Sequence, residues 1–390
     1  MSKLEMLFWG CSSIVFYTYL GYGIILFSLV KLKAIFIKEH PKFESPFLPK
    51  VTLFVAAYNE ISCIKEKVKN MFEIDYPADR LQILFITDGS NDGSTAYLEG
   101  INGVEVLHEN NRGGKIGAIN RGMGYVKHPI VIYSDANAML NPQSVKEIVK
   151  HYEDPVIGCV AGEKRVFSNG DDGASGAGEG IYWKYESFLK KYDFKLHSAV
   201  GAAGELFSIR TELHQKVEKD TILDDFIISL RIAMKGYKIA YEPAAFASEY
   251  ASESIQEEKK RKVRISAGGI QSTVRLLKLF NPFKYGWLTF QFVSHRVLRW
   301  TVSPVFLFLV FPLNLVLALE SDLYFYWILF YCQILFYLSA GIGYFLQKNQ
   351  LKYKIFFVPF YFVFMNVCVF LGINRYLNGN QSVLWEKARK

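Results

Sequence analysis

The sequence predicts an α/β domain with a mostly parallel sheet, in a chain that also carries α-helical transmembrane segments. Between about residues 50 and 152, short apolar runs alternate with helical patterns, which is typical of a doubly wound α/β fold. Uncharged apolar runs at 6–30 and 323–345 each exceed the ~20 helical residues that cross a hydrocarbon layer ~30 Å thick. We therefore expect a transmembrane anchor over residues 1–37, a globular domain over 38–284, and an interfacial helix with a C-terminal transmembrane bundle over 285–390.

The charges favour a membrane location over nucleic-acid binding. Lys and Arg total 45 against 37 Asp and Glu, a net charge of +8. The basic residues crowd beside the apolar runs, at 31–38, 259–264 and 348–354, where anionic lipid headgroups attract them. We therefore expect membrane lipids and no nucleic acid among the partners. The five cysteines show no C-x-x-C spacing, which argues against a zinc site.

The basic residues also predict the topology. Cytoplasmic loops are enriched in Lys and Arg, so residues 31–38 place the globular domain in the cytoplasm. We expect a multi-pass protein of the plasma or inner membrane with three or four spans. The run 355–371 is either a full span or a kinked, partly re-entrant helix, because a full span puts the basic tail 385–390 outside. The side of the C-terminus is left open.

The elements of the globular domain follow in order. Apolar runs that end in polar turn residues predict strands at 50–58, 81–87, 104–108 and 130–134. Helical spacing of apolar residues between them predicts helices at 61–72, after Gly93, at 115–125 and at 142–152. A further helix is expected at 181–191, after a glycine-rich flexible loop at 169–180.

Polar clusters follow three of these strands, at 58–60, 88–93 and 135–137. The ligand crevice of an open parallel sheet lies beyond the carboxyl ends of its strands. Carboxylates there can bind ribose hydroxyls and a hard divalent cation, so we expect a nucleotide and metal site. Asp88 and Asp92 have an alternative interpretation, because turns and helix caps use the same residues.

Four segments, 56–60, 87–94, 111–120 and 133–137, resemble in order and spacing the motifs of family-two, GT-A-fold glycosyltransferases. The resemblance covers about residues 50–265 and is greatest with the membrane-embedded branch that includes cellulose, hyaluronan and poly-N-acetylglucosamine synthases. It implies a GT-A domain that transfers a sugar with inversion from a nucleotide-sugar donor, usually a UDP-sugar.

The resemblance also implies roles for donor-site residues. Asp135 would be the first residue of the D-x-D element, which meets the diphosphate and its Mg²⁺ or Mn²⁺. Asn137 stands at the third position, where an amide is a weaker ligand than a carboxylate, so Asp135 alone, or with a histidine or water, is the alternative. The other donor-binding residues would be Ala57, Tyr58 and Glu60 around the uridine, Asp88 at the base or ribose, and Lys115 at the nucleotide or diphosphate.

Asp224 and Asp225 are the expected catalytic residues. They match the family's acidic pair before a short helix, in which the position of Asp225 is the general base and Asp224 replaces the usual Glu. A sugar hydroxyl is a poor nucleophile, so a carboxylate must take its proton as the new bond forms. Neighbouring carboxylates raise each other's pKa, which suits a base that works near neutrality. The alternative is a stabilising role at the helix N-terminus.

Gly204 and Glu205 are expected on the acceptor side. Segment 201–210 resembles the small-residue turn that lies beneath the donor sugar and the acceptor terminus. Glycines there would allow the backbone to approach the ligand closely. A plain turn at the entry to a strand is the alternative.

Arg261 and Arg264 are expected at the acceptor and the diphosphate, respectively. Processive members of the family carry Q-x-x-R-W on an interfacial helix, where the Trp stacks on the acceptor sugar. This chain has Arg261 for the Gln and Ile265 for the Trp, so Arg264 can still clamp a diphosphate while the stacking platform is missing. A basic run against lipid headgroups is the alternative.

We therefore predict a hexosyltransferase of polysaccharide biosynthesis that acts at the cytoplasmic membrane face on a polysaccharide or lipid-linked saccharide acceptor. The departure at Ile265 keeps a single-addition enzyme acting on lipid-linked sugar as an alternative. A non-catalytic nucleotide-sugar-binding membrane subunit is the alternative from another class. The sequence identifies no export partner.

Overall fold

The computed structural model describes residues 1–36, 47–167, 174–250, 254–349 and 353–379. Contacts divide the chain into two compact units. The α/β unit comprises Val30–Phe167 and Lys190–Tyr250, and the helical unit comprises Met1–Leu29, Ser168–Leu189 and Ala251–Asn380.

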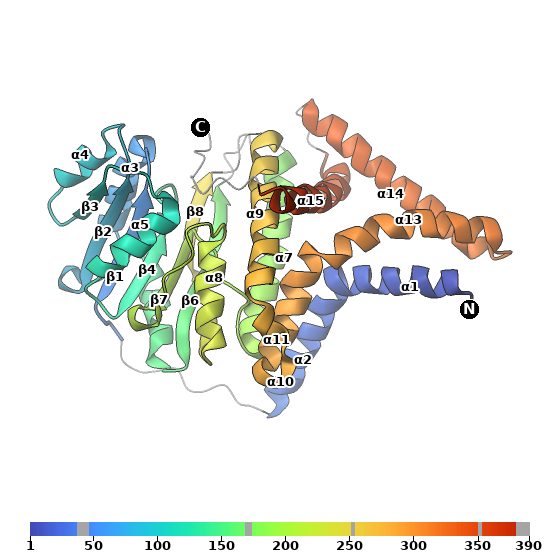
Figure 1. The fold of residues 1–390 in the computed structure, drawn as a ribbon, viewed down its shortest axis with the longest axis horizontal. Coiled ribbons are helices and arrows are strands. Elements are labelled where there is room, and N and C mark those ends of the chain that lie inside the picture. The colour runs from blue at the N-terminus through green and yellow to red at the C-terminus, as the bar shows by residue number, and fades with distance from the viewer. Residues whose placement is uncertain (37–46, 168–173, 251–253, 350–352, 380–390) are drawn as a thin grey trace. The chain divides into compact units, whose positions relative to one another are not determined.

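The α/β unit is built on an eight-stranded, mostly parallel sheet of order β3-β2-β1-β4-β7-β6-β8-β5 (Figure 1). The first four strands in this order are parallel to one another, and β6 is parallel to β8. The strand β7 runs antiparallel to β4 and β6, and β5 runs antiparallel to β8. The strands are β1 (Val51–Ala57), β2 (Leu81–Asp88), β3 (Glu105–Glu109), β4 (Ile130–Ser134), β5 (Met139–Leu140), β6 (Ile157–Phe167), β7 (Leu206–Arg210) and β8 (Lys238–Tyr250).

Helices cover both faces of the sheet because successive residues of each strand point to opposite sides. Leu53 and Val55 of β1 join a core cluster with Ile64 of the first helix after that strand. Phe54 faces the other side, where it packs so closely that a Cβ on Gly122 would lie 2.6 Å from its ring. The helices of this unit are α3 (Ile61–Phe72), α4 (Ser94–Glu99), α5 (Gly114–Gly122), α6 (Ser144–Val149) and α8 (Asp224–Met234), whereas α7 (Ala174–Leu196) belongs up to Leu189 to the helical unit.

The predicted strands and helices up to residue 152 are confirmed, and α7 differs from its prediction. This helix begins at Ala174, so the expected flexible loop is helical from that residue onward. Residues 168–173 of that loop lie outside the described part of the chain.

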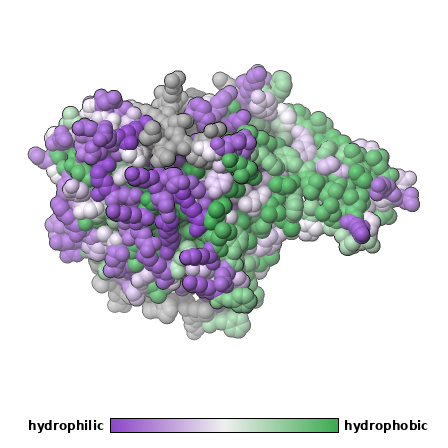
Figure 2. Space-filling model, viewed as in Figure 1, coloured by the Kyte–Doolittle hydropathy of each residue, from purple (hydrophilic) through white to green (hydrophobic). Residues whose placement is uncertain are grey.

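Within the described residues, four helices are long and apolar enough to cross a membrane. Hydrophobic side chains cover the region of α1, α13 and α14, while hydrophilic side chains dominate the α/β unit (Figure 2). The last helix is continuous although it contains Pro359, and the tail 385–390 lies outside the described residues. The four helices are Lys3–Phe36 (α1, Lys3–Phe16; η1, Tyr17–Gly21; α2, Tyr22–Phe36), α13 (Val302–Glu320), α14 (Tyr324–Lys348) and Ile355–Leu377 within α15 (Lys354–Leu377).

The boundary expected at residue 284 differs from the division by contacts. The helix α9 (Ile255–Arg275) belongs to the helical unit because it packs along α15, where Gly372 leaves room for Ser266. The expected interfacial segment is helical without a break over residues 287–300, and it begins after Gly286, which adopts a φ of +52°. It comprises α11 (Trp287–Phe292), the π-helical η7 (Val293–Val297) and α12 (Leu298–Trp300), and the short α10 (Pro282–Tyr285) precedes Gly286.

Three basic side chains of the helix over residues 287–300 surround one buried carboxylate of α7. Nε2 of His295 lies 3.3 Å from Glu186, and Nη1 of Arg296 lies 3.0 Å from it. Arg299 forms a further ion pair with Glu186. Burial raises the pKa of Glu186, but these basic neighbours outweigh burial and hold that pKa well below its usual range. His295, Arg296 and Arg299 therefore form an ionic cluster with Glu186 inside the helical unit.

Candidate active site

Three charged side chains from different elements converge on Gly204, which precedes β7. A methyl group placed on Gly204 would lie 3.3 Å from Nζ of Lys115 and 3.7 Å from Oδ2 of both Asp135 and Asp225. Lys115 lies in the first turn of α5, Asp135 follows β4, and Asp225 lies in the first turn of α8. Because Gly204 has no side chain, it leaves the space in which these groups meet.

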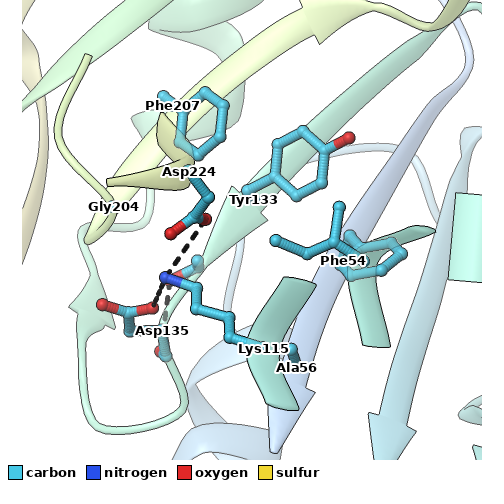
Figure 3. Close-up of a pocket in the computed structure, with 10 residues that line it drawn as sticks. Phe54, Ala56, Lys115, Tyr133, Asp135, Gly204, Phe207 and Asp224 are labelled. Carbon is cyan, nitrogen blue, oxygen red and sulfur yellow. Dashed lines mark hydrogen bonds and ion pairs between the residues drawn. The ribbon is translucent and has the colours of Figure 1, made fainter. Parts of the chain in front are cut away.

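Lys115 joins two carboxylates across this space (Figure 3). Its Nζ lies 2.9 Å from Oδ1 of Asp135 and 3.5 Å from Oδ2 of Asp224. Burial lowers the pKa of Lys115, but the carboxyl groups of Asp135, Asp224 and Asp225 outweigh burial and hold that pKa above its ordinary value. The ammonium group is therefore charged and neutralises part of the acidic cluster.

A narrow cavity opens beside the ion pair (Figure 3). The rings of Tyr133 and Phe207 stack at its wall with their centroids 4.6 Å apart. Apolar walls with a few polar groups are typical of small-molecule sites. The other residues that line the cavity are Phe54, Ala56, Lys115, Ile119, Ser134, Asp135, Gly204 and Asp224.

Asp225 has the acidity of a base that works near neutrality. Burial raises its pKa, the adjacent Asp224 carboxylate raises it further, and Lys115 opposes both, so that the pKa is about 7. Asp224 is only 6% exposed and is held by its ion pair with Lys115. The charge of Lys115 thus acts on both aspartates, and burial keeps the pKa of Asp225 at about 7 all the same.

Asp88 lies beside this site and braces it from outside the cavity. It is 3% exposed, its Oδ2 accepts a hydrogen bond of 2.7 Å from the Gly114 N–H, and its Oδ1 pairs with Arg121 at 3.3 Å. These contacts fix the start of α5 and thereby place Lys115. Asp92 likewise accepts hydrogen bonds from two backbone N–H groups, at 3.0 Å each. Both carboxylates thus hold the backbone at the start of a helix, and the role of Asp88 at the base or ribose stays a prediction.

The residues expected around the uridine lie at the end of β1. The Ala57 side chain is 1% exposed in the core, whereas Ala56 lines the cavity, because alternate residues of a strand face opposite sides. The ring of Tyr58 lies 3.7 Å from the guanidinium carbon of Arg112, a cation–π contact. Glu60 is half-buried at the start of α3.

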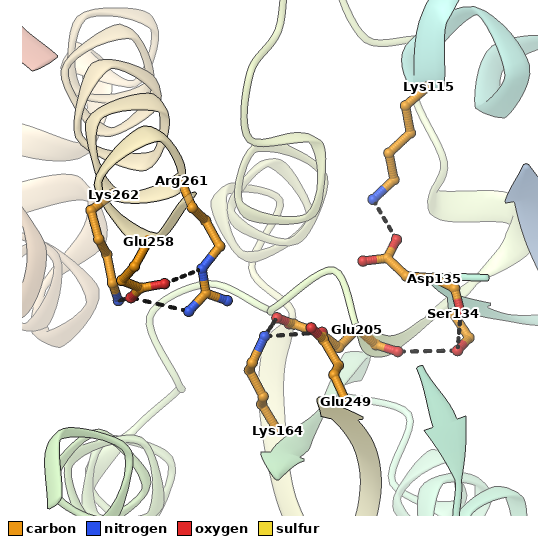
Figure 4. A network of polar contacts seen from close by, with 9 residues as sticks. All are labelled: Lys115, Ser134, Asp135, Lys164, Glu205, Glu249, Glu258, Arg261 and Lys262. Carbon is orange, nitrogen blue, oxygen red and sulfur yellow. Dashed lines mark hydrogen bonds and ion pairs between the residues drawn. The ribbon is translucent and has the colours of Figure 1, made fainter. Parts of the chain in front are cut away.

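The Glu205 carboxylate is held by a buried lysine (Figure 4). Lys164 of β6 forms ion pairs with Glu205 and, at 2.9 Å, with Glu249 of β8. The backbone carbonyl of Glu205 accepts a hydrogen bond of 3.1 Å from the Ser134 hydroxyl. The Glu205 side chain, which was expected on the acceptor side, is thus already paired with Lys164. The backbone of Glu205 contacts Ser134, which precedes the Asp135 turn.

Arg261 and Arg264 belong to α9 in the helical unit, whereas the other predicted site residues belong to the α/β unit. Arg261 donates hydrogen bonds of 3.0 and 3.2 Å to Glu258, one turn earlier on the same helix (Figure 4). The Arg264 side chain is exposed.

Sequence reasoning missed Lys67, a fully buried lysine of α3. Burial lowers the pKa of Lys67 to about 7. The signal was its spacing, because Lys67 lies three residues after Ile64 and four before Met71, on the apolar face of the helix. A basic residue in such a row is rarely buried without a polar partner.

Residues 52–217 match the model of the family described as glycosyl transferase family 2. This chain carries a glycosyltransferase domain. The matched residues include 52–57 of β1, the strands β2 to β4, Lys115 and Asp135, but they end before Asp224 and Asp225.

Curated relatives of the glycosyltransferase domain include poly-beta-1,6-N-acetyl-D-glucosamine synthases. The protein from Staphylococcus aureus (strain COL) is 24% identical over 251 residues, covering 61% of this chain and 59% of that protein. The protein from Staphylococcus epidermidis is 24% identical over 258 residues, covering 62% of this chain and 61% of that protein. The match thus spans about three fifths of the length of these relatives.

A solved structure shows the same fold. It is the mannosyltransferase PcManGT from Pyrobaculum calidifontis in complex with GDP-Man and Mn²⁺. The TM-score is 0.73 with 20% identity, covering 96% of this chain and 99% of that chain. The Rossmann-like, mostly parallel sheet of the glycosyltransferase domain is therefore a GT-A fold, as the resemblance implied.

Asp135 and Asn137 of the glycosyltransferase domain can hold a divalent ion. Both are half-buried and present oxygen atoms in the turn between β4 and β5. Within the described part of the chain, no group of three His, Cys, Asp or Glu side chains is arranged to bind an ion unaided. Mg²⁺ typically takes one or two protein carboxylates and completes its shell with substrate phosphates and water. These two side chains fit an ion that binds together with a diphosphate.

Proposed function

We propose that this chain is an inverting glycosyltransferase that moves a sugar from a nucleotide-sugar, a UDP-sugar in particular, to an acceptor hydroxyl. The observation that carries the proposal is the convergence of Lys115, Asp135 and Asp225 on Gly204. It supplies a base, a cation for an anionic leaving group and an oxygen ligand for a metal within one small space. The family match and the GT-A fold support the same chemistry.

In the proposed reaction the Asp225 carboxylate takes the proton of the acceptor hydroxyl. The acceptor oxygen then forms a bond to the anomeric carbon while the bond from that carbon to the diphosphate breaks, which inverts the configuration. The leaving nucleoside diphosphate carries away the electron pair of the broken bond. Lys115 offers positive charge to this diphosphate, and Asp135 with Asn137 would hold Mg²⁺ or Mn²⁺, which stabilises the departing negative charge.

The acceptor in this proposal is a growing polysaccharide or a lipid-linked saccharide. The polysaccharide synthases among the relatives support the first. Ile265, which stands where processive enzymes of the resembled branch place a Trp, favours a single addition to a lipid-linked saccharide as the second candidate. The four apolar helices support a multi-pass membrane location, and the basic residues 31–38 support a cytoplasmic catalytic domain.

Donor screening in membranes tests the proposal. Membranes that contain the full chain are supplied with radiolabelled UDP-sugars, or with GDP-mannose because the structural neighbour contains GDP-Man, with Mn²⁺, with Mg²⁺ or with a chelator. We expect metal-dependent incorporation from one donor. Sizing the product separates a polymer from a single addition. Donor binding without transfer from any donor would refute the proposal in favour of a non-catalytic subunit.

A further inference from the structure

Lys67 closes the base of the turn that carries Asp135 and Asn137. The Lys67 side chain is fully buried in the α/β unit. Its Nζ donates a hydrogen bond of 2.7 Å to the Ser134 hydroxyl and another to the carbonyl oxygen of Ala138. Ser134 immediately precedes the turn and Ala138 immediately follows it, so one amine group ties together the two ends of the turn.

The Ser134 hydroxyl carries this connection to a second loop. Because its oxygen accepts a hydrogen bond from Lys67, its single hydrogen is available for an acceptor. That hydroxyl donates to the carbonyl of Glu205 at 3.1 Å. Lys67 and Ser134 therefore link the loop of Asp135 to the loop of Gly204 and Glu205, and these two loops border the space described above.

Packing alone does not explain a lysine at this position. The neighbours of Lys67 on the same face of α3 are Ile64, Val68 and Met71, and all of them are buried. Removing an amine from water is costly unless hydrogen bonds compensate it, and an apolar side chain would fill the same face without this cost. The benefit of Lys67 lies in its two acceptors, which are polar groups at the ends of the turn.

We propose that Lys67 is a positioning residue, which holds the Asp135–Asn137 turn in the geometry that binds a divalent cation with the donor diphosphate. This inference rests on the proposed function. Lys67 touches neither donor nor ion, and it acts through Ser134 and Ala138. Outer partners that orient metal ligands typically contribute ~10- to 100-fold to metal affinity.

Mn²⁺ binding tests the role of Lys67 without relying on catalysis. The purified full chain in detergent is titrated with Mn²⁺ in the presence of UDP, and free Mn²⁺ is measured by electron paramagnetic resonance. In Lys67→Met we expect Mn²⁺ affinity to fall by about tenfold or more. In transfer assays, we expect the Mn²⁺ concentration at half-maximal rate to rise in parallel.

Asn70 provides the matched control. It lies one turn further along α3 and makes two hydrogen bonds of 2.8 Å with the backbone of Leu140 in β5. Asn70→Leu therefore removes two bonds between the same helix and the same segment, but none at the ends of the turn. We expect it to lower thermal stability while Mn²⁺ affinity stays at the wild-type value.

Two results overturn the inference. One is wild-type Mn²⁺ affinity in Lys67→Met, and the other is an equal loss of affinity in Asn70→Leu. If Lys67→Met does not fold, Ser134→Ala decides, since it removes the hydroxyl link and should weaken Mn²⁺ binding. Unchanged affinity in Ser134→Ala then refutes the inference. Wild-type protein that binds no Mn²⁺ with UDP and transfers no sugar from any donor would instead refute the proposed function, and the inference with it.

Discussion

Replacing Asp225 with Asn should abolish most of the transfer activity and leave donor binding almost intact. The amide keeps the size of the side chain but cannot accept the proton of the acceptor hydroxyl. A positioned general base contributes ~10²- to 10⁴-fold to rate, so we expect turnover to fall by at least about a hundredfold, or about 2.7 kcal/mol of transition-state stabilisation. The donor KM should change little, because Lys115 and Asp135 are unaltered.

The pH profile of the wild-type enzyme provides the quantitative part of this prediction. The pKa of Asp225 is about 7, raised by burial and then by Asp224. The base must be deprotonated, so the rate should rise with pH and level off above neutrality. One pH unit below the pKa, about one molecule in ten holds the active form, so the rate should fall about tenfold for each further unit of acidification.

The assay is transfer of radiolabelled sugar by purified protein at saturating donor, repeated between pH 5 and pH 9 with the mutant. Asp154→Asn is the matched control, because Asp154 is an exposed aspartate of the same unit whose carboxylate only accepts a backbone hydrogen bond. Turnover in Asp225→Asn within about threefold of wild type, or an unchanged acidic limb in that mutant, would refute the assignment of the base.

Further predictions concern the site, the fold and the metal. Gly204→Ala should lower turnover with little change in thermal stability, since its methyl group would intrude among the charged groups that surround Asp225; an unaffected rate would contradict the assigned space. Burial raises the pKa of Glu242, but hydrogen bonds from a histidine and a lysine outweigh burial and lower that pKa to about 2. Its charged form therefore stabilises the fold above the unfolded pKa of ~4.3, and this stabilisation is lost as pH falls toward 2. Glu242→Gln should thus lower the melting temperature at pH 7 by clearly more than at pH 3, and an equal difference at both values would refute the ionic contribution. Gly269→Ala should destabilise the helical unit, because a Cβ there would lie 2.4 Å from the ring of Trp300; a wild-type melting temperature would show that the ring can move. Chelation of divalent ions should stop transfer and Mn²⁺ should restore it, and full activity in chelator would remove the metal from the proposal.

The sequence predicted half of the sheet with accurate ends. The strands β1 to β4 are short apolar runs that stop at polar turn residues, so their limits can be read from composition. The strands β5, β6 and β8 were not predicted, and β7 was indicated only by the alternative interpretation of segment 201–210 as a turn at the entry to a strand. β6 carries Lys164 and β8 carries Pro243 within mixed residues that have no clear period. The ion pairs of Lys164 with Glu205 and Glu249 compensate the buried charge of β6, and pairing between distant segments leaves no local signal.

The sequence predicted the residues expected to bind the donor or metal better than the residues that position them. Residues that follow strand ends share one edge of the sheet, which predicted Asp135 at the site, while the family resemblance implied Lys115 at the nucleotide or diphosphate. The ligand role of Asp88 stays a prediction, and the structure adds the contacts of its carboxylate with α5, which depend on packing that the sequence does not display. Lys67 was overlooked although its helical spacing put it among buried residues.

The acidic cluster around Lys115 affects the order of events at the mouth of the site. Three carboxyl groups gather at this one lysine, so a diphosphate that arrives alone meets mostly charge of its own sign. In a partly buried setting such repulsion is weakly screened by salt. Electrostatics therefore favours binding of the donor as a complex with its divalent cation. A free nucleotide should compete poorly with the donor for the site unless a divalent salt is present.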